Sequence, residues 1–449
     1  MKKQNLRYMK WIGKMIVLLF IFNFQFSIFD CSAQRVSLDE CLEKALESNF
    51  SIKIIRNEAR MDKNNLNYST FLPTLEGTAK QTQTRNDTKT ENSAGEVNKM
   101  SDVKTDNYTA GVALNWRIFD GLEMFTTHEK QKELLAMGEL AVQQAVENLI
   151  LNVSAAYYNV LVQHHKLMAA RHSLERSNER YDEARVRYKI GNRSGLEAQQ
   201  AKIDLNTDSS TYVRQKEALK SAYITLNKLM NTDLQMVNYV QDTILLGPQL
   251  VLGTLEQKTL AGNTTLLIAK KDQKISALDL KNARAVLFPT LDFNSGSNYN
   301  KTDTPSSSTT LNRSNGFYWG FSLNVPIFSR LQNRTKIKNA KLELENTELS
   351  YQEAEKETLG DLALMYNSYE NNLLMVNFEI ESASVAEANL DAALEKYKIG
   401  SLSGIEFREF QRSYIDAVDR KLSAIYQAKV SELSLLLLSG DIRGSFVSE

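Results

Sequence analysis

Residues 187–191 read RYKIG, and residues 396–400, 209 positions later, read KYKIG. The segment SGLE at 194–197 recurs at the same offset as SGIE at 403–406. Matches that keep their order and spacing indicate an internal duplication of roughly 200 residues, which is too long for a stacked solenoid repeat. We therefore predict two structural repeats, residues 34–240 and residues 241–449.

Residues 1–33 are typical of a secretory export signal. Five cations precede an apolar segment at 16–29, and the small residues around Cys31 and Ala33 fit a cleavage site. The alternative interpretations are an uncleaved membrane anchor and a lipoprotein cleaved at Cys31, against which Asp30 argues because a small residue is wanted there. Cleavage after Ala33 leaves Cys41 as the single cysteine of the mature chain, so an intrachain disulfide is not expected.

The charge balance and composition exclude several classes of protein. The 449 residues carry 54 basic and 54 acidic side chains, which argues against a strongly basic nucleic-acid binder. Hydrophobic residues make up 42% of the chain, a content that excludes a disordered protein. Only 5 prolines occur, and a chain with so few helix breakers can form very long helices.

Two long segments carry the 3.5-residue period of coiled coils. Apolar and small residues follow strict 4-3 spacing over residues 149–188 and again over residues 362–397. One continuous helix over residues 123–190 would span about 100 Å. We predict long antiparallel helical hairpins at about 122–231 and 330–440, with Gly191 and Gly400 in left-handed conformation at their turns.

Segments with a period of two precede each helical hairpin. The sequence predicts β-hairpins at about 75–117 and 290–326, with strands of 9–11 residues and long polar loops at 86–106 and 300–315. Strands of this length cross a bilayer when tilted, and one face is aromatic and aliphatic. Because four strands cannot close a barrel and an open edge is not tolerated in lipid, membrane-spanning strands would require an oligomer.

Together these motifs resemble the TolC-like outer-membrane efflux protein family. The resemblance covers essentially the whole chain after the leader and depends on the order of three motifs in each half: the strand entries LPT (72–74) and FPT (288–290), the strand exits WRIFDG and VPIFS, and the YKIG turns. It implies a mainly α-helical fold with a β-barrel portion. The long coiled-coil helices would form a periplasmic α-barrel, and four strands per chain would contribute to a twelve-stranded outer-membrane barrel in a homotrimer.

The resemblance also implies the function and the partners of the chain. A member of this family is a passive export channel in the bacterial outer membrane, for efflux or for type I secretion. It works with a periplasmic adaptor (a membrane fusion protein) and an inner-membrane transporter, and outer-membrane lipid surrounds its strands. From the sequence alone, a soluble periplasmic coiled-coil rod or adaptor-like protein is the alternative.

The resemblance places candidate functional residues at the two YKIG turns. Two acidic residues three positions apart match the family's closed entrance, and three copies would crowd six carboxylates, raising some pKa values and attracting cations. The position of the family's gate arginine is Leu402 here, so Arg193 of the first turn is a candidate substitute. The candidate gate residues are Glu406, Glu409, Glu197, Arg193 and Tyr397. The candidate adaptor contacts are Ile190, Gly191, Asn192, Ile399, Gly400, Ser401 and Leu402.

Each of these residues also has a simpler interpretation. Glu406 and Glu409 could form a solvated charged face, Tyr397 could be a packing residue, and the turns could be plain hairpin connections. No phosphate-binding loop, nucleophile motif or zinc-protease motif occurs, so we expect no enzymatic activity, no cofactor and no metal. The heptad-spaced pair His165 and His172 lacks the supporting ligands of a metal site.

Overall fold

The computed structural model describes residues 35–444, except residues 92, 192, 193, 238, 241, 242 and 306–309. The predicted export signal therefore lies outside the described residues. Most of the described chain is α-helical, and four of its strands form one antiparallel sheet. The predicted fold class, mainly helical with four strands per chain, is confirmed.

Two compact units make up the chain, and each combines segments from both predicted repeats. The first consists of Met1–Asn49, Leu149–Pro248 and Ser368–Leu433, and the second of Phe50–Asn148, Gln249–Asn367 and Ser434–Glu449. Two helices of 67 residues, α4 (Glu123–Lys189) and α8 (Gln332–Lys398), contribute to both units. The repeat boundary between residues 240 and 241 stays a prediction.

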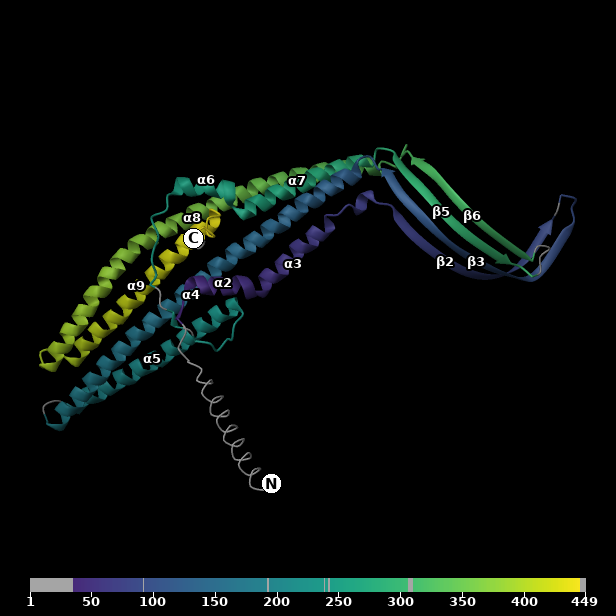
Figure 1. Ribbon diagram of the computed structural model, residues 1–449. Coiled ribbons are helices and arrows are strands. Elements are labelled where there is room, and N and C mark those ends of the chain that lie inside the picture. Colours follow the sequence, from purple (N-terminus) through teal and green to yellow (C-terminus); the bar gives the residue numbers. More distant parts are fainter. Residues whose placement is uncertain are drawn as a thin grey trace, which may run out of the picture. The chain divides into compact units, whose positions relative to one another are not determined.

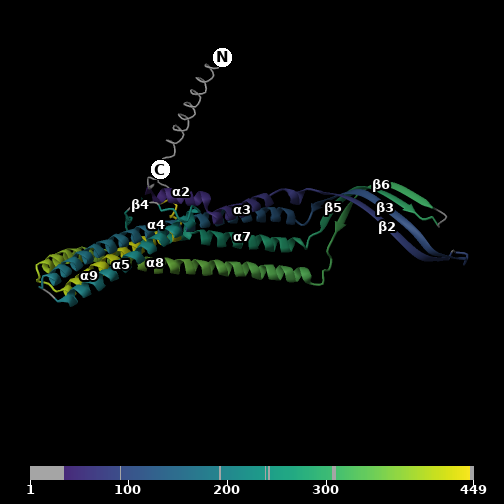
Figure 2. The same ribbon diagram turned by 90° about the horizontal axis from the view of Figure 1, so that it is seen from below.

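The first unit contains two antiparallel helix pairs. The C-terminal part of α4 pairs with α5 (Gly195–Met230), and that of α8 pairs with α9 (Gly404–Leu438), as Figures 1 and 2 show. No proline occurs in these four helices, so their backbone hydrogen bonds run uninterrupted over many turns. The unit also holds α2 (Leu38–Ser48) and a short parallel pairing of β1 (Arg35–Val36) with β4 (Tyr239–Val240).

The predicted heptad positions form the buried seams of α4 and α8. The buried members include Leu149, Val153, Val160, Ala170, Ser177 and Ala184 in α4, and Leu362, Tyr369, Val376, Ala383, Leu390 and Tyr397 in α8. The prediction is wrong at Tyr188, which is 55% exposed. Tyr188 lies next to the turn between α4 and α5, and its ring lies beside Gly195. Because Gly195 has no side chain, the ring stays exposed.

The second unit contains three further helices, the four-stranded sheet and the remaining parts of α4 and α8. Its helices are α3 (Phe50–Asn65), α6 (Leu252–Gly262) and α7 (Thr264–Ala285). Glu147 of α4 is buried and accepts hydrogen bonds from Gln143 Nε2 at 2.8 Å and from Thr264 Oγ1 at 2.6 Å. Thr264 begins α7, so this carboxylate ties α7 to α4. None of the described helices is both long and apolar enough to cross a bilayer.

The four strands pair in the order β2-β3-β5-β6, and every pairing is antiparallel. Their bounds are β2 Thr74–Glu91, β3 Val97–Phe119, β5 Thr290–Asp303 and β6 Leu311–Asn324. β2 and β6 each have one partner strand among the described residues, so the sheet has two unpaired edges (Figure 1).

The predicted strand lengths and loop bounds are wrong. The strands have 14 to 23 residues, and the segments expected as polar loops continue the β-ladder as far as the pairs Glu91↔Val97 and Asp303↔Leu311. Polar residues such as Thr, Asn and Lys can extend a ladder when water reaches both faces, because backbone hydrogen bonds do not require apolar side chains. The apolar alternation therefore ends several residues before the strands themselves end.

The two faces of the sheet differ in chemistry. One face, here called the apolar face, carries Phe317, Trp319, Phe321 and Leu323 of β6, each 63–72% exposed. Cross-strand rows on this face join β6 to its neighbours, for example Leu75↔Leu114↔Ser295↔Trp319. The opposite, polar face carries Gly316, Gly320 and Ser322, and an ion pair between Arg117 and Asp292 at 2.9 Å. The sheet therefore exposes a large apolar surface.

Candidate functional site

The two helical turns have the conformation that the sequence predicted. Gly191 and Gly400 adopt positive φ angles of 76° and 79°, which L-residues with side chains rarely adopt. Beside them, Ile190 and Ile399 are 69% and 79% exposed. Ser401 is also exposed and Leu402 is half-buried, whereas Asn192 and Arg193 lie outside the described residues. The turns thus present bare aliphatic side chains to the surroundings.

Glu406 forms a capping box at the start of α9. Its Oε2 accepts a hydrogen bond from Ser403 N at 2.9 Å, and Ser403 Oγ accepts one from Glu406 N at 3.2 Å. Hydrogen bonding from Ser403 lowers the pKa of Glu406, so within one chain this carboxylate is charged at neutral pH. Glu409 is exposed one turn later on the same helix. Both acids thus lie on α9, three positions apart, and Glu406 also has a local structural role; their place at a gate stays a prediction.

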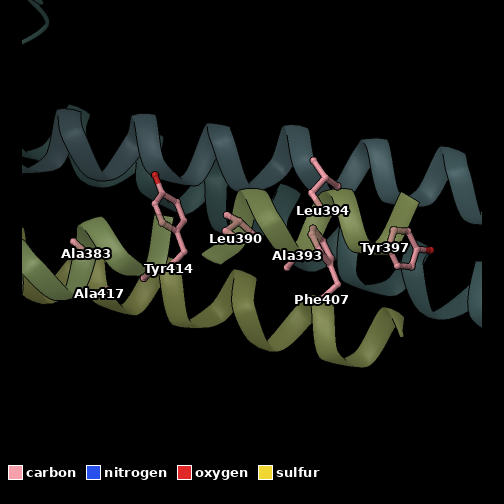
Figure 3. Packing of buried hydrophobic residues seen from close by; sticks show 9 residues of the cluster. Ala383, Leu390, Ala393, Leu394, Tyr397, Phe407, Tyr414 and Ala417 are labelled. Atoms are coloured by element: carbon pink, nitrogen blue, oxygen red, sulfur yellow. The ribbon is translucent and has the colours of Figure 1, made fainter. Parts of the chain in front are cut away.

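Tyr397 joins the end of α8 to the start of α5. The side chain is 1% exposed, and its hydroxyl donates a hydrogen bond to Glu197 Oε1 at 3.3 Å. Burial raises the pKa of Tyr397, and the negative charge of Glu197 raises it further. The structure thus brings together two of the predicted gate residues. Figure 3 shows Tyr397 beside Phe407 in the apolar core between α8 and α9.

Two arginines of α4, absent from the predicted site, surround Tyr397. The guanidinium of Arg187 lies 5.3 Å from the Tyr397 ring centroid and donates hydrogen bonds to the carbonyls of Tyr397 and Lys398. These carbonyls belong to the last turn of α8, where helical partners are missing. The guanidinium of Arg180 lies 5.9 Å from the same ring. α4 therefore holds the C-terminal end of α8 through two cationic groups.

Arg180 is fully buried and lies beside a glycine. Its Nη1 is 2.7 Å from Asp204 Oδ2 on α5, and its side chain is 2% exposed. A Cβ at Gly404 would lie 2.8 Å from Nη2 of Arg180, closer than atoms normally approach. Glycine at this first position of α9 thus makes room for a buried guanidinium.

A further group of polar side chains connects α5 and α4 to α9. Asp208 of α5 accepts hydrogen bonds at 2.7 and 2.9 Å from the two terminal nitrogens of Arg408. Gln411 Nε2 lies within 3.0 Å of Asp208, Ser173 and Ser177, and Ser177 also donates to Asp208. Burial by itself lowers the pKa of Arg408, but Asp208 and Asp204 raise it by more. We call Asp208, Arg408, Gln411, Ser173 and Ser177 the buried polar layer.

A sequence signal for these missed residues exists in the return helix. Ala201, Asp204, Leu205 and Asp208 of α5 are all buried, at the i, i+3, i+4, i+7 positions of one helix face. Two carboxylates on a face of this kind indicate buried cations opposite them. The heptad pattern over residues 149–188 and 362–397 lies in the outgoing helices and does not include this face of α5. In the described residues, no group of three or more His, Cys, Asp or Glu side chains could hold a metal ion.

The chain thus combines long helical pairs, glycine turns with positive φ and a sheet with one apolar face, and known proteins share this combination. The family model described as "Outer membrane efflux protein" matches residues 41–232 and 255–441. The chain belongs to the outer membrane efflux protein family. Both matched segments contain one β-hairpin and one long helical hairpin, which agrees with the internal duplication.

Curated relatives and a solved structure support this membership. The chain is 23% identical to the cation efflux system protein CusC of Escherichia coli over 71% of this chain and 70% of CusC. It is 20% identical to the outer membrane protein TolC of Escherichia coli over 73% of this chain and 68% of TolC. The structure of the Campylobacter jejuni CmeC outer membrane channel matches with a TM-score of 0.76 at 18% identity, covering 90% of this chain and 86% of CmeC.

This family membership decides between the two hypotheses from the sequence. The protein is an outer-membrane efflux channel whose helices lie in the periplasm, and the soluble-rod alternative is rejected. Efflux, outer-membrane location and channel character were all predicted from the repeated motifs. Members of this family are channel proteins rather than enzymes.

Proposed function

We propose that this efflux protein works as a homotrimer whose three sheets close into one twelve-stranded barrel. The observation that carries this proposal is the four-stranded sheet with one apolar face and two unpaired edges, β2 and β6. Unpaired backbone groups are not tolerated in lipid, and pairing β2 with β6 of the next copy removes every edge. A closed threefold ring is the smallest such ring with a lumen wide enough for a duct.

Reconstitution into a planar bilayer tests this duct. The purified full-length protein is expected to give discrete conductance steps, and cysteines placed on β2 and β6 are expected to form a three-chain cross-linked species. A preparation that crosslinks only to dimers, or that never conducts, contradicts the proposed trimeric duct.

The helical turns are the proposed contact with a periplasmic adaptor and, through it, with an inner-membrane transporter. Support comes from the exposed aliphatic side chains Ile190 and Ile399 beside two glycines in left-handed conformation. Exposed apolar groups on a fixed turn favour a protein partner, because burying them releases ordered water. The proposed contact set comprises Ile190, Gly191, Asn192, Ile399, Gly400, Ser401 and Leu402. The export signal over residues 1–33 and the two repeats also remain proposals.

The proposed gate consists of the acids and the tyrosine near these turns. In a trimer, three copies of Glu406 and Glu409 would converge, and Glu197 would hold Tyr397 through the 3.3 Å hydrogen bond. Arg193 remains a proposed substitute for the gate arginine. Arg187 is a further candidate for that role, because it already binds the last carbonyls of α8.

Replacing both acids by glutamine is expected to change how cations pass the gate. Glu406→Gln with Glu409→Gln removes up to six negative charges per trimer but keeps a hydrogen-bond acceptor for the Ser403 amide. We expect cation block of the conductance to weaken severalfold, because rings of carboxylates concentrate cations. Single-channel recording with added divalent cations measures this. Glu395→Gln, at an exposed acid of α8, is the matched control, and an equal effect of both changes would remove Glu406 and Glu409 from the gate.

A further inference from the structure

The apolar face of the sheet ends in a row of side chains that includes two cations. Lys301 of β5 and Arg313 of β6 are direct cross-strand partners, and Tyr108 of β3 and Gln81 of β2 continue the same row. We call these four residues the cationic row. Because side chains alternate between faces, the row shares a face with Phe317 and lies one row beyond Tyr299.

The cationic row places two like charges side by side. Like charges directly opposite in a sheet destabilise it. Among the described residues, no carboxylate lies within ion-pair distance of Lys301 or Arg313. Asp106, one row further on, already accepts a hydrogen bond from Gln83 Nε2 at 2.7 Å and pairs with Lys104 at 3.2 Å. Lys301 and Arg313 thus have no ion-pair partner among the described residues at this border of the apolar face, and the nearest carboxylates, Asp106 and Asp303, lie in the next row.

The Lys301 side chain is held in place by its neighbours. Its ammonium lies 5.3 Å from the Tyr108 ring centroid, and Gln81 Nε2 donates a hydrogen bond to the Tyr108 hydroxyl at 2.9 Å. An ammonium over an aromatic ring is an attractive arrangement that limits its motion. The ammonium of Lys301 is therefore held against the surface of the sheet.

The other border of the apolar face has no such row. There the cross-strand neighbours are Phe119, Leu291 and Leu323, all apolar, and the chain continues from Phe119 toward helix α4. The helices are periplasmic, so this apolar border is the inner one and the cationic row lies at the outer border. Cations that merely extend to water from a membrane interface are expected at both borders.

We propose that the cationic row binds phosphate groups of anionic lipid in the outer leaflet of the outer membrane. The proposal rests on the proposed membrane-spanning trimer. A phosphate placed between Lys301 and Arg313 would neutralise the like-charge pair while its acyl chains cover the adjoining apolar face. Tyr108, with an aromatic ring and a polar end, suits this same boundary.

Binding of a phosphorylated lipid to the purified full-length trimer tests the proposal. Native mass spectrometry during titration with bisphosphorylated lipid A is expected to show saturable binding. Lys301→Gln with Arg313→Gln is expected to weaken it roughly 25-fold, since each cation near an anionic lipid surface contributes about fivefold. Dephosphorylated lipid A is expected to bind the unaltered protein as weakly as the double variant binds the phosphorylated form.

Lys80→Gln is the matched control for Lys301→Gln. Lys80 of β2 directly precedes Gln81 of the cationic row. It pairs with Thr109 and therefore lies on the polar face. It is expected to leave lipid binding within twofold. Three results would overturn the proposal. Lys80→Gln and Lys301→Gln could weaken lipid binding equally, the double variant could bind lipid as tightly as the unaltered protein, or dephosphorylated lipid A could bind as tightly as the phosphorylated form. Displacement of the lipid by inorganic phosphate alone would also contradict it. A failure of the trimer itself appears separately, as the absence of three-chain ions in the unaltered protein.

Discussion

Replacing Asp208 by alanine is expected to destabilise the helical hairpins by about 3–5 kcal/mol, the usual cost of leaving one partner of a buried ion pair alone. Asp208 receives two hydrogen bonds from Arg408 and further ones from Ser177 and Gln411. Without it, the largely buried guanidinium of Arg408 loses its carboxylate partner and keeps only the hydrogen bond to Gln411 Oε1, while Ser177 loses its acceptor. The measurement is the thermal unfolding midpoint of the detergent-solubilised protein, followed by circular dichroism.

Two comparisons make this expectation specific. Asp419→Ala removes a carboxylate that is 56% exposed and pairs with Lys166, and it is expected to cost less than about 1 kcal/mol. Asp208→Leu combined with Arg408→Met replaces both charges by apolar groups and is expected to be nearly neutral. If Asp208→Ala and Asp419→Ala shift the midpoint equally, the buried polar layer does not stabilise the hairpins.

The heptad pattern predicted the long helices because it reflects one dominant interaction. Most seam residues of α4 and of α8 are buried against neighbouring helices, because burial of apolar area follows the sequence period. Gly191 and Gly400 were equally predictable, since few residues other than glycine adopt positive φ in a tight helical turn. Periodicity and backbone geometry are local properties that a single sequence displays directly.

The buried polar layer could not be derived in the same way. Arg408 and Asp208 are 200 residues apart, and Gln411 and Ser173 are 238 apart, so their pairing depends on how the two helix pairs pack. The sequence shows a buried-face carboxylate at Asp208, but it does not show which of many arginines faces it. Arg187 illustrates the same limit, because its acceptors are backbone carbonyls, which carry no residue-specific signal.

The ends of the strands were mispredicted for a related reason. Alternation marks where a strand has one apolar face, and that condition ends near Tyr299 and Phe317. The backbone continues in extended conformation to Asp303 and from Leu311, because antiparallel pairing is stabilised by its own hydrogen bonds. The apolar alternation thus marks the part of the sheet that has one apolar face, whereas the backbone ladder extends over the whole sheet.

Replacing Trp319 by arginine is expected to prevent stable insertion into the outer membrane. Trp319 lies among the apolar residues of the edge strand β6 and is 65% exposed. Its ring is nearly perpendicular to that of Phe321, with 6.4 Å between the two ring centroids. An arginine on the lipid-facing side at the bilayer midplane costs about 2–4 kcal/mol per chain, and the proposed trimer would contain three. The amount of protein in the outer-membrane fraction, together with its conductance, measures the effect.

The adjacent residue provides the control for Trp319→Arg. Gly320 lies on the polar face, and a Cβ there would meet no atom within 4 Å. Gly320→Arg is therefore expected to insert normally and to alter only conductance, because its charge would enter the aqueous lumen. Circular dichroism should show the same helix content in both variants. Normal insertion of Trp319→Arg would mean that lipid does not contact the apolar face, and both the closed barrel and the lipid-binding cationic row would then have to be abandoned.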